Sequence, residues 1–207
     1  MPYTDHLVTT MEQLESMYGE VFPPARVKEI DHVNADYRAF IEKAPFVAMA
    51  TAGAGGLDCS PRGDPAGFVR VHDEKTVMIP DRRGNNRIDS LRNIIEDPRV
   101  ALLFLIPGCS ETIRVIGRAQ ICTDPELCQS FEMQGKAPRC VIIVAVERVY
   151  FQCAKAIVRS KLWDPAMHVP RGKLASTGAM VAALTKGKVD AEAYDREAPA
   201  RIKAQLY

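Results

Sequence analysis

The sequence lacks an excess of charge of either sign. Its 27 lysines and arginines are balanced by 26 aspartates and glutamates, which leaves a formal net charge of +1. Nucleic acids and anionic membrane surfaces select proteins with a large excess of positive charge, so we expect neither as a partner. Recognition of phosphate by this chain must therefore depend on a local cluster of basic residues.

Long apolar segments are lacking too. The longest apolar run, at 141–146, has the length of a strand and is far shorter than the roughly 20 residues of a membrane-spanning helix. Residues 1–6 are polar and have neither the basic nor the apolar region of a signal peptide. We therefore expect a cytoplasmic protein that does not bind a membrane.

Metal-ligand pairs and familiar catalytic motifs are also missing. The six cysteines include no Cys-x-x-Cys pair, and the four histidines are scattered, so we expect reduced thiols and no metal site. The chain has no Gly-x-Ser-x-Gly, Walker or His-Glu-x-x-His motif. Any enzyme chemistry is therefore expected to belong to a bound cofactor.

What the sequence does contain predicts one α+β domain that is mainly β. Helical spacing predicts helices within 9–43 and, in the tail, at 178–184 and 189–206. Between them, six or seven short apolar segments joined by tight turns indicate an antiparallel sheet, and closure into a small barrel would remove its edges. The predicted parts are an N-terminal helical extension at 1–44, a barrel at 45–165 and a C-terminal helical tail at 166–207.

The most informative stretch is 80–95. A strand-like segment precedes it, a glycine and two asparagines typical of turns and N-caps follow, and then apolar residues recur at helical spacing. A helix N-terminus offers free N–H groups, and a guanidinium such as that of Arg87 can bind two phosphate oxygens. The stretch predicts an anion site of monophosphate size. A capped helix with solvated arginines has the same pattern, and we expect Arg82 and Arg83 to be solvated or to contact a partner chain.

An ordered series of motifs between about Phe46 and Trp163 resembles the FMN-binding split barrels related to pyridoxamine 5′-phosphate oxidase. The series is Ser60-Pro61-Arg62-Gly63-Asp64, Phe68-Val69-Arg70-Val71, Gly84-Asn85-Asn86-Arg87, Glu96-Asp97-Pro98-Arg99-Val100 and Val158-Arg159-Ser160-Lys161-Leu162-Trp163-Asp164-Pro165. It is most similar to a flavin-nucleotide-binding branch that combines the first and third of these motifs. The resemblance implies an antiparallel split β-barrel of the FMN-binding type, and a homodimer with two FMN molecules at the subunit interface.

The resemblance also implies which residues bind the phosphate and the ribityl chain of FMN. Arg87, Asn85 and Asn86 would hold the phosphate at the start of the helix. Arg62 would add a second guanidinium, and Asp64 would accept hydrogen bonds from ribityl hydroxyls. As an alternative, Arg62 and Asp64 pair with each other within the turn.

Five further residues are implied at the flavin ring. The backbone of Phe68 and Val69, in a strand predicted at 68–72, would face the pyrimidine edge. Ser160, Lys161 and Trp163, donated by the other subunit, would close the ring side. As an alternative, Trp163 is a plain core or dimer anchor, because tryptophan is favoured at interfaces regardless of ligands.

The chain departs from the oxidases proper at the segment that grips the substrate phosphate. In those enzymes the tryptophan segment is followed by an Arg-apolar-His-acid-Arg stretch, whereas His168 of this chain lacks both flanking arginines. We therefore expect an FMN-dependent oxidoreductase that acts on a small molecule other than pyridoxamine 5′-phosphate. The alternative is a flavin-binding protein without turnover, acting as a carrier, store or sensor.

Overall fold

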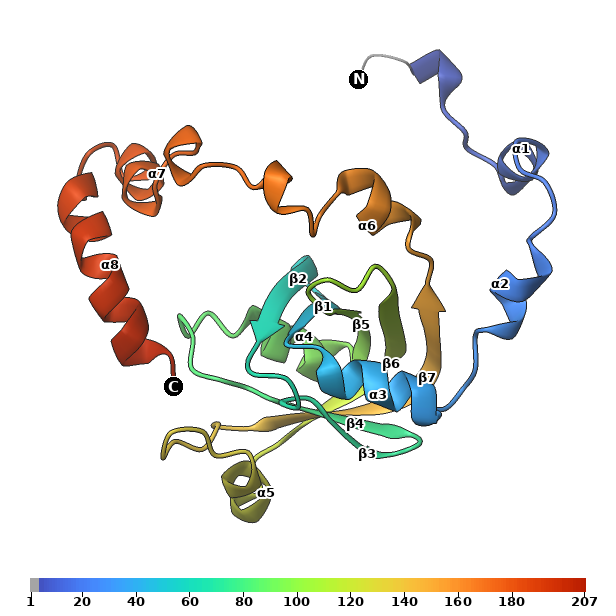
Figure 1. The fold of residues 1–207 in the computed structure, drawn as a ribbon, viewed down its shortest axis with the longest axis horizontal. Helices are drawn as coiled ribbons and strands as arrows, with labels where there is room; N and C mark the ends of the chain where they lie inside the picture. Colours follow the sequence, from blue (N-terminus) through green and yellow to red (C-terminus); the bar gives the residue numbers. More distant parts are fainter. Residues whose placement is uncertain (1–3) are drawn as a thin grey trace.

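Seven strands form one antiparallel sheet at the centre of the computed structural model, which describes residues 4–207 (Figure 1). The strands are β1 (Phe46–Gly53), β2 (Gly56–Gly63), β3 (Arg70–Asp73), β4 (Thr76–Pro80), β5 (Arg99–Leu105), β6 (Thr112–Cys122) and β7 (Val141–Gln152). They lie in the order β2-β1-β5-β6-β7-β4-β3, and the two end strands do not pair with each other. The predicted antiparallel α+β fold and split barrel are confirmed, and the sheet is not closed.

Eight α-helices are found within residues 4–207, and they lie between the strands and in the two terminal extensions. They are α1 (Met11–Ser16), α2 (Pro23–Val27), α3 (Ala35–Lys43), α4 (Asp89–Glu96), α5 (Pro125–Ser130), α6 (Lys155–Ser160), α7 (Thr177–Leu184) and α8 (Ala191–Gln205). The first three residues of the predicted N-terminal extension lie outside the described part of the chain. No helix within that part is long and apolar enough to span a membrane.

The barrel core is built from alternate residues of neighbouring strands. Met49, Leu102 and Val115 lie side by side on β1, β5 and β6, and all three are fully buried. Helix α3 covers one end of this core with Tyr37 and Ile41, which are both buried, as its helical spacing predicts. Cross-strand apolar rows of this kind are the main stabilising unit of a sheet.

Two predicted strand boundaries differ from the structure. The strand predicted at 68–72 begins at Arg70, because the Phe68 N–H donates to the carbonyl of Pro65 within a turn. The apolar run at 141–146, which has the length of a strand by itself, continues to Gln152 as one strand, β7. Polar residues follow this run in the sequence, but the pairing register shifts there, and this bulge lets the strand continue.

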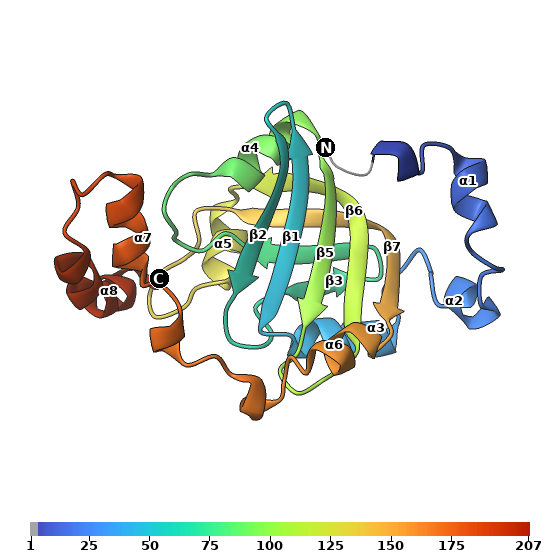
Figure 2. The same cartoon turned by 90° about the horizontal axis from the view of Figure 1, so that it is seen from above.

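Residues 4–27 and the segment that follows β7 form two arms that stand away from the barrel (Figures 1 and 2). In the first arm, Thr10 caps α1 through a capping box with Gln13, and α2 begins at Pro23. The second arm contains α6, α7 and α8, and Pro199 lies inside α8 without ending it. Helices α1, α2 and α8 bury no residue, so neither arm contributes to the barrel core.

The close approach of β6 and β7 requires glycine at position 117. A Cβ atom there would lie 2.0 Å from the backbone carbonyl oxygen of Ala145. We predict that Gly117→Ala lowers the free energy of unfolding by about 1–3 kcal/mol, because one strand must shift to admit the methyl group. The control is Gly172→Ala, since a Cβ at Gly172 meets nothing within 4 Å. Equal urea midpoints for the two variants would contradict this account.

Candidate functional site

A cavity of about 1080 Å³ lies where β2, the loop at 81–88 and the first turn of α4 meet. Its basic lining residues are Arg62, Arg82, Arg83, Arg87, Lys136 and Arg139, and its acidic lining residues are Asp58, Asp81 and Asp89. The cavity thus has an excess of three positive charges, although the whole chain has a formal net charge of only +1. A concave site with this imbalance attracts anions, and it lies at the predicted stretch.

Helix α4 begins at the cavity without a side-chain cap. Its N-cap is Ile88, which has a left-handed backbone (φ 54°) and makes no capping hydrogen bond. The prediction that the asparagines cap this helix is wrong, because both are engaged elsewhere. Asn85 Oδ1 accepts from the Arg87 N–H at 3.1 Å, and Asn86 Oδ1 accepts from Arg139 at 3.3 Å. The uncapped first turn offers N–H groups to a ligand.

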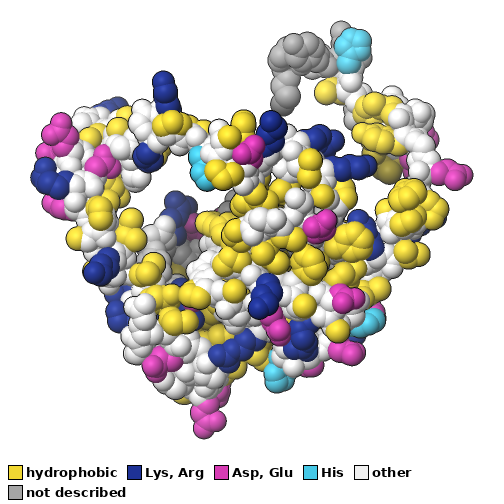
Figure 3. Space-filling view, in the orientation of Figure 1, with side chains coloured by type: hydrophobic (Ala, Val, Ile, Leu, Met, Phe, Trp, Pro, Cys, Tyr) yellow, Lys and Arg dark blue, Asp and Glu magenta, His cyan; other side chains and the backbone are white. Residues whose placement is uncertain are grey.

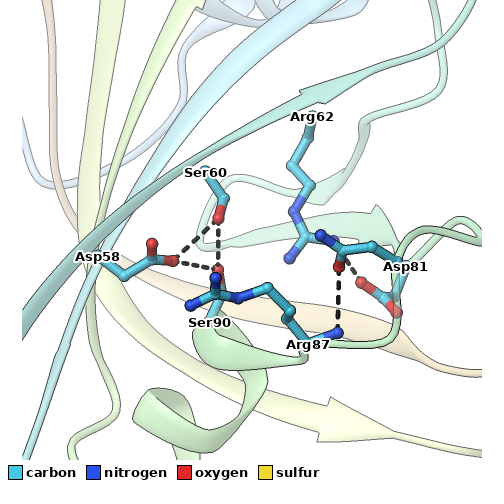
Figure 4. A network of polar contacts seen from close by, with 7 residues as sticks. Asp58, Ser60, Arg62, Asp81, Arg87 and Ser90 are labelled. Carbon is cyan, nitrogen blue, oxygen red and sulfur yellow. Dashed lines mark hydrogen bonds and ion pairs between the residues drawn. The ribbon is translucent and has the colours of Figure 1, made fainter. Parts of the chain in front are cut away.

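Arg62 of β2 lines the cavity and forms an ion pair with Asp81 (Figure 4). It does not pair with Asp64, so that alternative is wrong. The Nε atom of Arg62 is buried and has no hydrogen-bond partner. Buried donors without an acceptor are rare in folded proteins, and at a cavity wall such a donor indicates a missing ligand or water.

Asp64 lies outside the cavity lining and holds the cavity wall together. Its side chain is 1% exposed, and its Oδ2 accepts from Arg82 Nε at 2.7 Å. Arg82 also donates to the carbonyl of Phe131 at 2.6 Å, so the prediction that Arg82 is solvated or at a partner chain is wrong. The second oxygen of Asp64 accepts from the hydroxyl of Tyr207 at 2.6 Å. No spacing in the sequence connects residues so far apart.

Arg87 is the most exposed of these ion-paired arginines. Its side chain is 74% exposed and its Nε lies 2.7 Å from Asp89 Oδ2. A pair so open to solvent contributes little to stability, which leaves the guanidinium free to exchange its carboxylate for a phosphate. Arg87, Asn85 and Asn86 all line the cavity, and their contact with a phosphate stays a prediction.

A cluster of hydroxyl and carboxylate groups lines the cavity near α4, and no sequence pattern predicted it. The buried Ser90 hydroxyl donates to Asp58 at 2.7 Å and lies 3.1 Å from the Ser60 hydroxyl (Figure 4). The hydrogen bond from Ser90 lowers the pKa of Asp58, with a smaller contribution from Ser60. Asp58 is therefore ionised near neutral pH. Ser60 stands within a recognised motif, but only the β2–α4 contact shows that it matters here.

The predicted ring-side residues are not all brought together. Phe68 is buried and lines the cavity, whereas Val69 is buried in the barrel core and is not part of the lining. Neither residue lies on a strand, because β3 begins at Arg70. The prediction that residues 68 and 69 belong to a strand is therefore wrong, and a contact of their backbone with a flavin ring stays a prediction.

Ser160, Lys161 and Trp163 lie on the second arm and do not line the cavity of their own chain. Ser160 donates to the Ile157 carbonyl, and Lys161 ends α6 in a left-handed conformation. The indole N–H of Trp163 donates to the carbonyl of Cys109 at 2.7 Å. The assignment of all three to a partner subunit stays a prediction.

The cavity lining offers little acid–base chemistry of its own. None of its described residues is a histidine. Burial, followed by the negative charge of Asp81, raises the pKa of Cys140 to about 11, so this thiol stays protonated near neutral pH. No group of three or more potential metal ligands occurs in residues 4–207. The basic lining residues make the cavity electrostatically suited to an anion.

Comparisons with known proteins place the barrel in a family. A model of the pyridoxamine 5′-phosphate oxidase family matches residues 33–153. A comparison with curated proteins finds no match. Among solved structures, HupZ of Group A Streptococcus is 20% identical, with a TM-score of 0.46 over 56% of this chain and 91% of that one. General Stress Protein 26 of Bacillus anthracis is 17% identical, with a TM-score of 0.41 over 55% and 88% of the two chains.

An FMN-binding protein from Syntrophomonas wolfei is 12% identical, with a TM-score of 0.44 over 56% of this chain and 83% of that one. The family model provides the firmer result, because it covers more than half of the sequence and nearly the whole barrel. The chain therefore belongs to the pyridoxamine 5′-phosphate oxidase family.

Proposed function

We propose that the cavity binds FMN and that the protein is an FMN-dependent oxidoreductase that acts as a homodimer. The observation that carries the proposal is the unsatisfied Nε donor of Arg62 in the wall of a basic cavity. Family membership supports a flavin as the occupant. The neighbouring uncapped helix start supports a phosphate group as the part of the ligand that this wall recognises.

The described residues fit FMN in size and charge. The volume of about 1080 Å³ slightly exceeds that of most ligand sites, which are roughly 300–1,000 Å³, so FMN has room. Arg87, Arg62 and the first N–H groups of α4 would hold the phosphate, and buried Phe68 supplies apolar surface. When bound, FMN supplies hydride and single-electron transfer. The chain supplies binding, orientation and a fixed positive field.

The outer face of the sheet supports a homodimer. Ala50, Ala101 and Ile116 lie side by side on β1, β5 and β6 and point away from the core. Ala48 and Leu103 form the next row, which continues to Arg114 on β6. No helix lies over these strands in Figure 2. An antiparallel sheet that faces water normally has polar residues on that side, so an apolar outer face favours a second protein layer.

The two arms support the same arrangement. Their exposed hydrophobic residues include Met17, Phe22, Val169 and Leu184. Figure 3 shows hydrophobic side chains on both arms and on the barrel between them. A second copy seated against the sheet would lie between the arms and cover these side chains. We propose that the partner's arm then supplies Ser160, Lys161 and Trp163 to the cavity.

The tail argues against vitamin B6 oxidation. His168 is exposed, and no arginine flanks it directly. We therefore propose a substrate other than pyridoxamine 5′-phosphate. No histidine lines the described cavity, so the chain that forms this cavity supplies no acid–base help of that residue type.

The phosphate contact predicts a selective loss of affinity. Arg87→Ala should weaken FMN binding by roughly tenfold to a hundredfold, because hydrogen bonds to charged groups contribute about 1.5–3 kcal/mol. Riboflavin, which lacks the phosphate, should bind the variant and the wild type equally, as measured by fluorescence titration. The control is Arg92→Ala, an exposed arginine of α4 outside the cavity lining, which should bind both ligands like the wild type. An equal loss for riboflavin would show that Arg87 serves the fold.

The apolar sheet face predicts a dimer at micromolar concentration. Leu103→Lys on the outer face of β5 should shift the protein toward monomer in sedimentation velocity, because a charge would be buried in the interface. The control is Arg118→Lys on β6, an exposed position that keeps its charge. A wild-type protein that sediments as a compact monomer would contradict the proposed interface.

The proposed chemistry predicts a reducible flavin and no vitamin B6 turnover. Under anaerobic conditions, NADH or NADPH should bleach the visible absorption band of the FMN-loaded protein. Pyridoxamine 5′-phosphate should leave the band unchanged. Pyridoxal 5′-phosphate should not form at a rate typical of enzymes, which is about 1 per second or faster. A band that neither nucleotide bleaches would favour the carrier, and rapid formation of pyridoxal 5′-phosphate would show that the tail contains another phosphate grip.

A further inference from the structure

Tyr207 takes part in the cavity wall although it lies 143 residues from its main partner. Its hydroxyl donates to Asp64 at 2.6 Å, and its ring lies near the guanidinium of Arg82, at 5.7 Å. The main-chain oxygen of Tyr207 accepts from Lys136 Nζ at 2.8 Å. The hydrogen bond to Asp64 raises the pKa of Tyr207, so the phenol remains a donor near neutral pH. Three segments of the barrel therefore hold one residue of the tail.

The rest of this tail has little hold on the barrel. Helix α8 buries no residue, and its Asp195 accepts from the Gly178 N–H of α7 at 2.7 Å, so the two helices stabilise each other as a pair. In Figures 1 and 2 this pair stands beside the barrel and approaches it at the end of α8. The described polar contacts that join the tail to the cavity are those of Tyr207.

We propose that Tyr207 is a positioning residue of the cavity, which docks α8 on the barrel as a strap and retains the bound ligand. The identity of that ligand as FMN rests on the proposed function. Tyr207 lines the cavity without filling it, because the cavity has a volume of about 1080 Å³ with the tyrosine in place. A ligand can therefore be present together with the docked strap.

The physical basis is the buried carboxylate of Asp64. With the strap docked, one oxygen is bound by Arg82 and the other by Tyr207. When the strap leaves, the second oxygen loses its donor, Arg82 loses an aromatic neighbour, and one side of the cavity opens. The hydrogen bond between Tyr207 and Asp64 is strong enough to dock the strap and weak enough to break reversibly. We therefore expect the ligand to be released after the strap opens.

The first test measures the strap without any ligand. Tyr207→Phe keeps the ring and removes the hydroxyl, and it should speed amide hydrogen exchange in residues 200–206 about tenfold. The control is Tyr194→Phe, a tyrosine of the same helix that stacks on Arg201, which should leave exchange at 200–206 unchanged. Equal exchange in wild type and Tyr207→Phe would overturn the proposed docking whatever the ligand is.

The second test measures release of FMN by stopped flow. Dissociation should be about tenfold faster from Tyr207→Phe than from the wild type, with association changed less than twofold and Tyr194→Phe like the wild type. In Asp64→Asn, where the carboxylate is absent, the same hydroxyl removal should have a smaller effect, which shows that the two residues act together. Release of FMN from Tyr207→Phe at the wild-type rate would overturn the strap while leaving FMN binding intact.

A failure of the proposed function is recognised separately. If the wild type takes up no FMN, the proposed cofactor is wrong, and the strap is judged with inorganic phosphate as the probe of the basic cavity. Phosphate should then slow exchange in residues 200–206 of the wild type and of Tyr194→Phe, and slow it less in Tyr207→Phe. Exchange that phosphate leaves unchanged in the wild type would overturn the coupling between strap and cavity.

Discussion

The carboxylate of Asp64 is the interaction on which the shape of the cavity depends. It lies just after β2, its side chain is almost fully buried, and its two oxygens bind groups from the loop after β4 and from the tail. A buried charge is costly unless it is paired, so these segments are obliged to stay together. Arg82 is thereby fixed, and the loop that follows it is held beside α4.

Basic side chains are concentrated at the cavity, and several of them are held there by ion pairs with aspartates. Asp81 and Asp89 orient Arg62 and Arg87 at the cavity. Burial, together with the positive charge of Arg82, lowers the pKa of Arg70 behind the same wall. Arginines crowded in this way repel one another, and an anion would relieve that repulsion. The site is therefore strongly basic, although the chain has almost no net charge.

The open sheet connects the site with the rest of the molecule. A split barrel leaves the outer edges of its two end strands unpaired, and here its outer surface at β1 and β5 carries apolar side chains as well. Both arms leave the barrel and keep their hydrophobic residues exposed. These features agree with a shared site, in which one chain supplies the basic cavity and another covers the opposite side.

The sequence by itself determined the antiparallel α+β fold, a helix at the end of the segment 9–43, and the strand end, turn and helix start within 80–95 that line the cavity, because these follow from local periodicity, turn chemistry and an ordered set of motifs. It did not determine the partners of the charged residues. Arg62 was expected beside Asp64 or at a ligand and pairs with Asp81, while Asp64 binds Arg82 and Tyr207. Only the tertiary structure decided these contacts, because they join segments up to 143 residues apart, and no local pattern records which strands and loops a fold brings together.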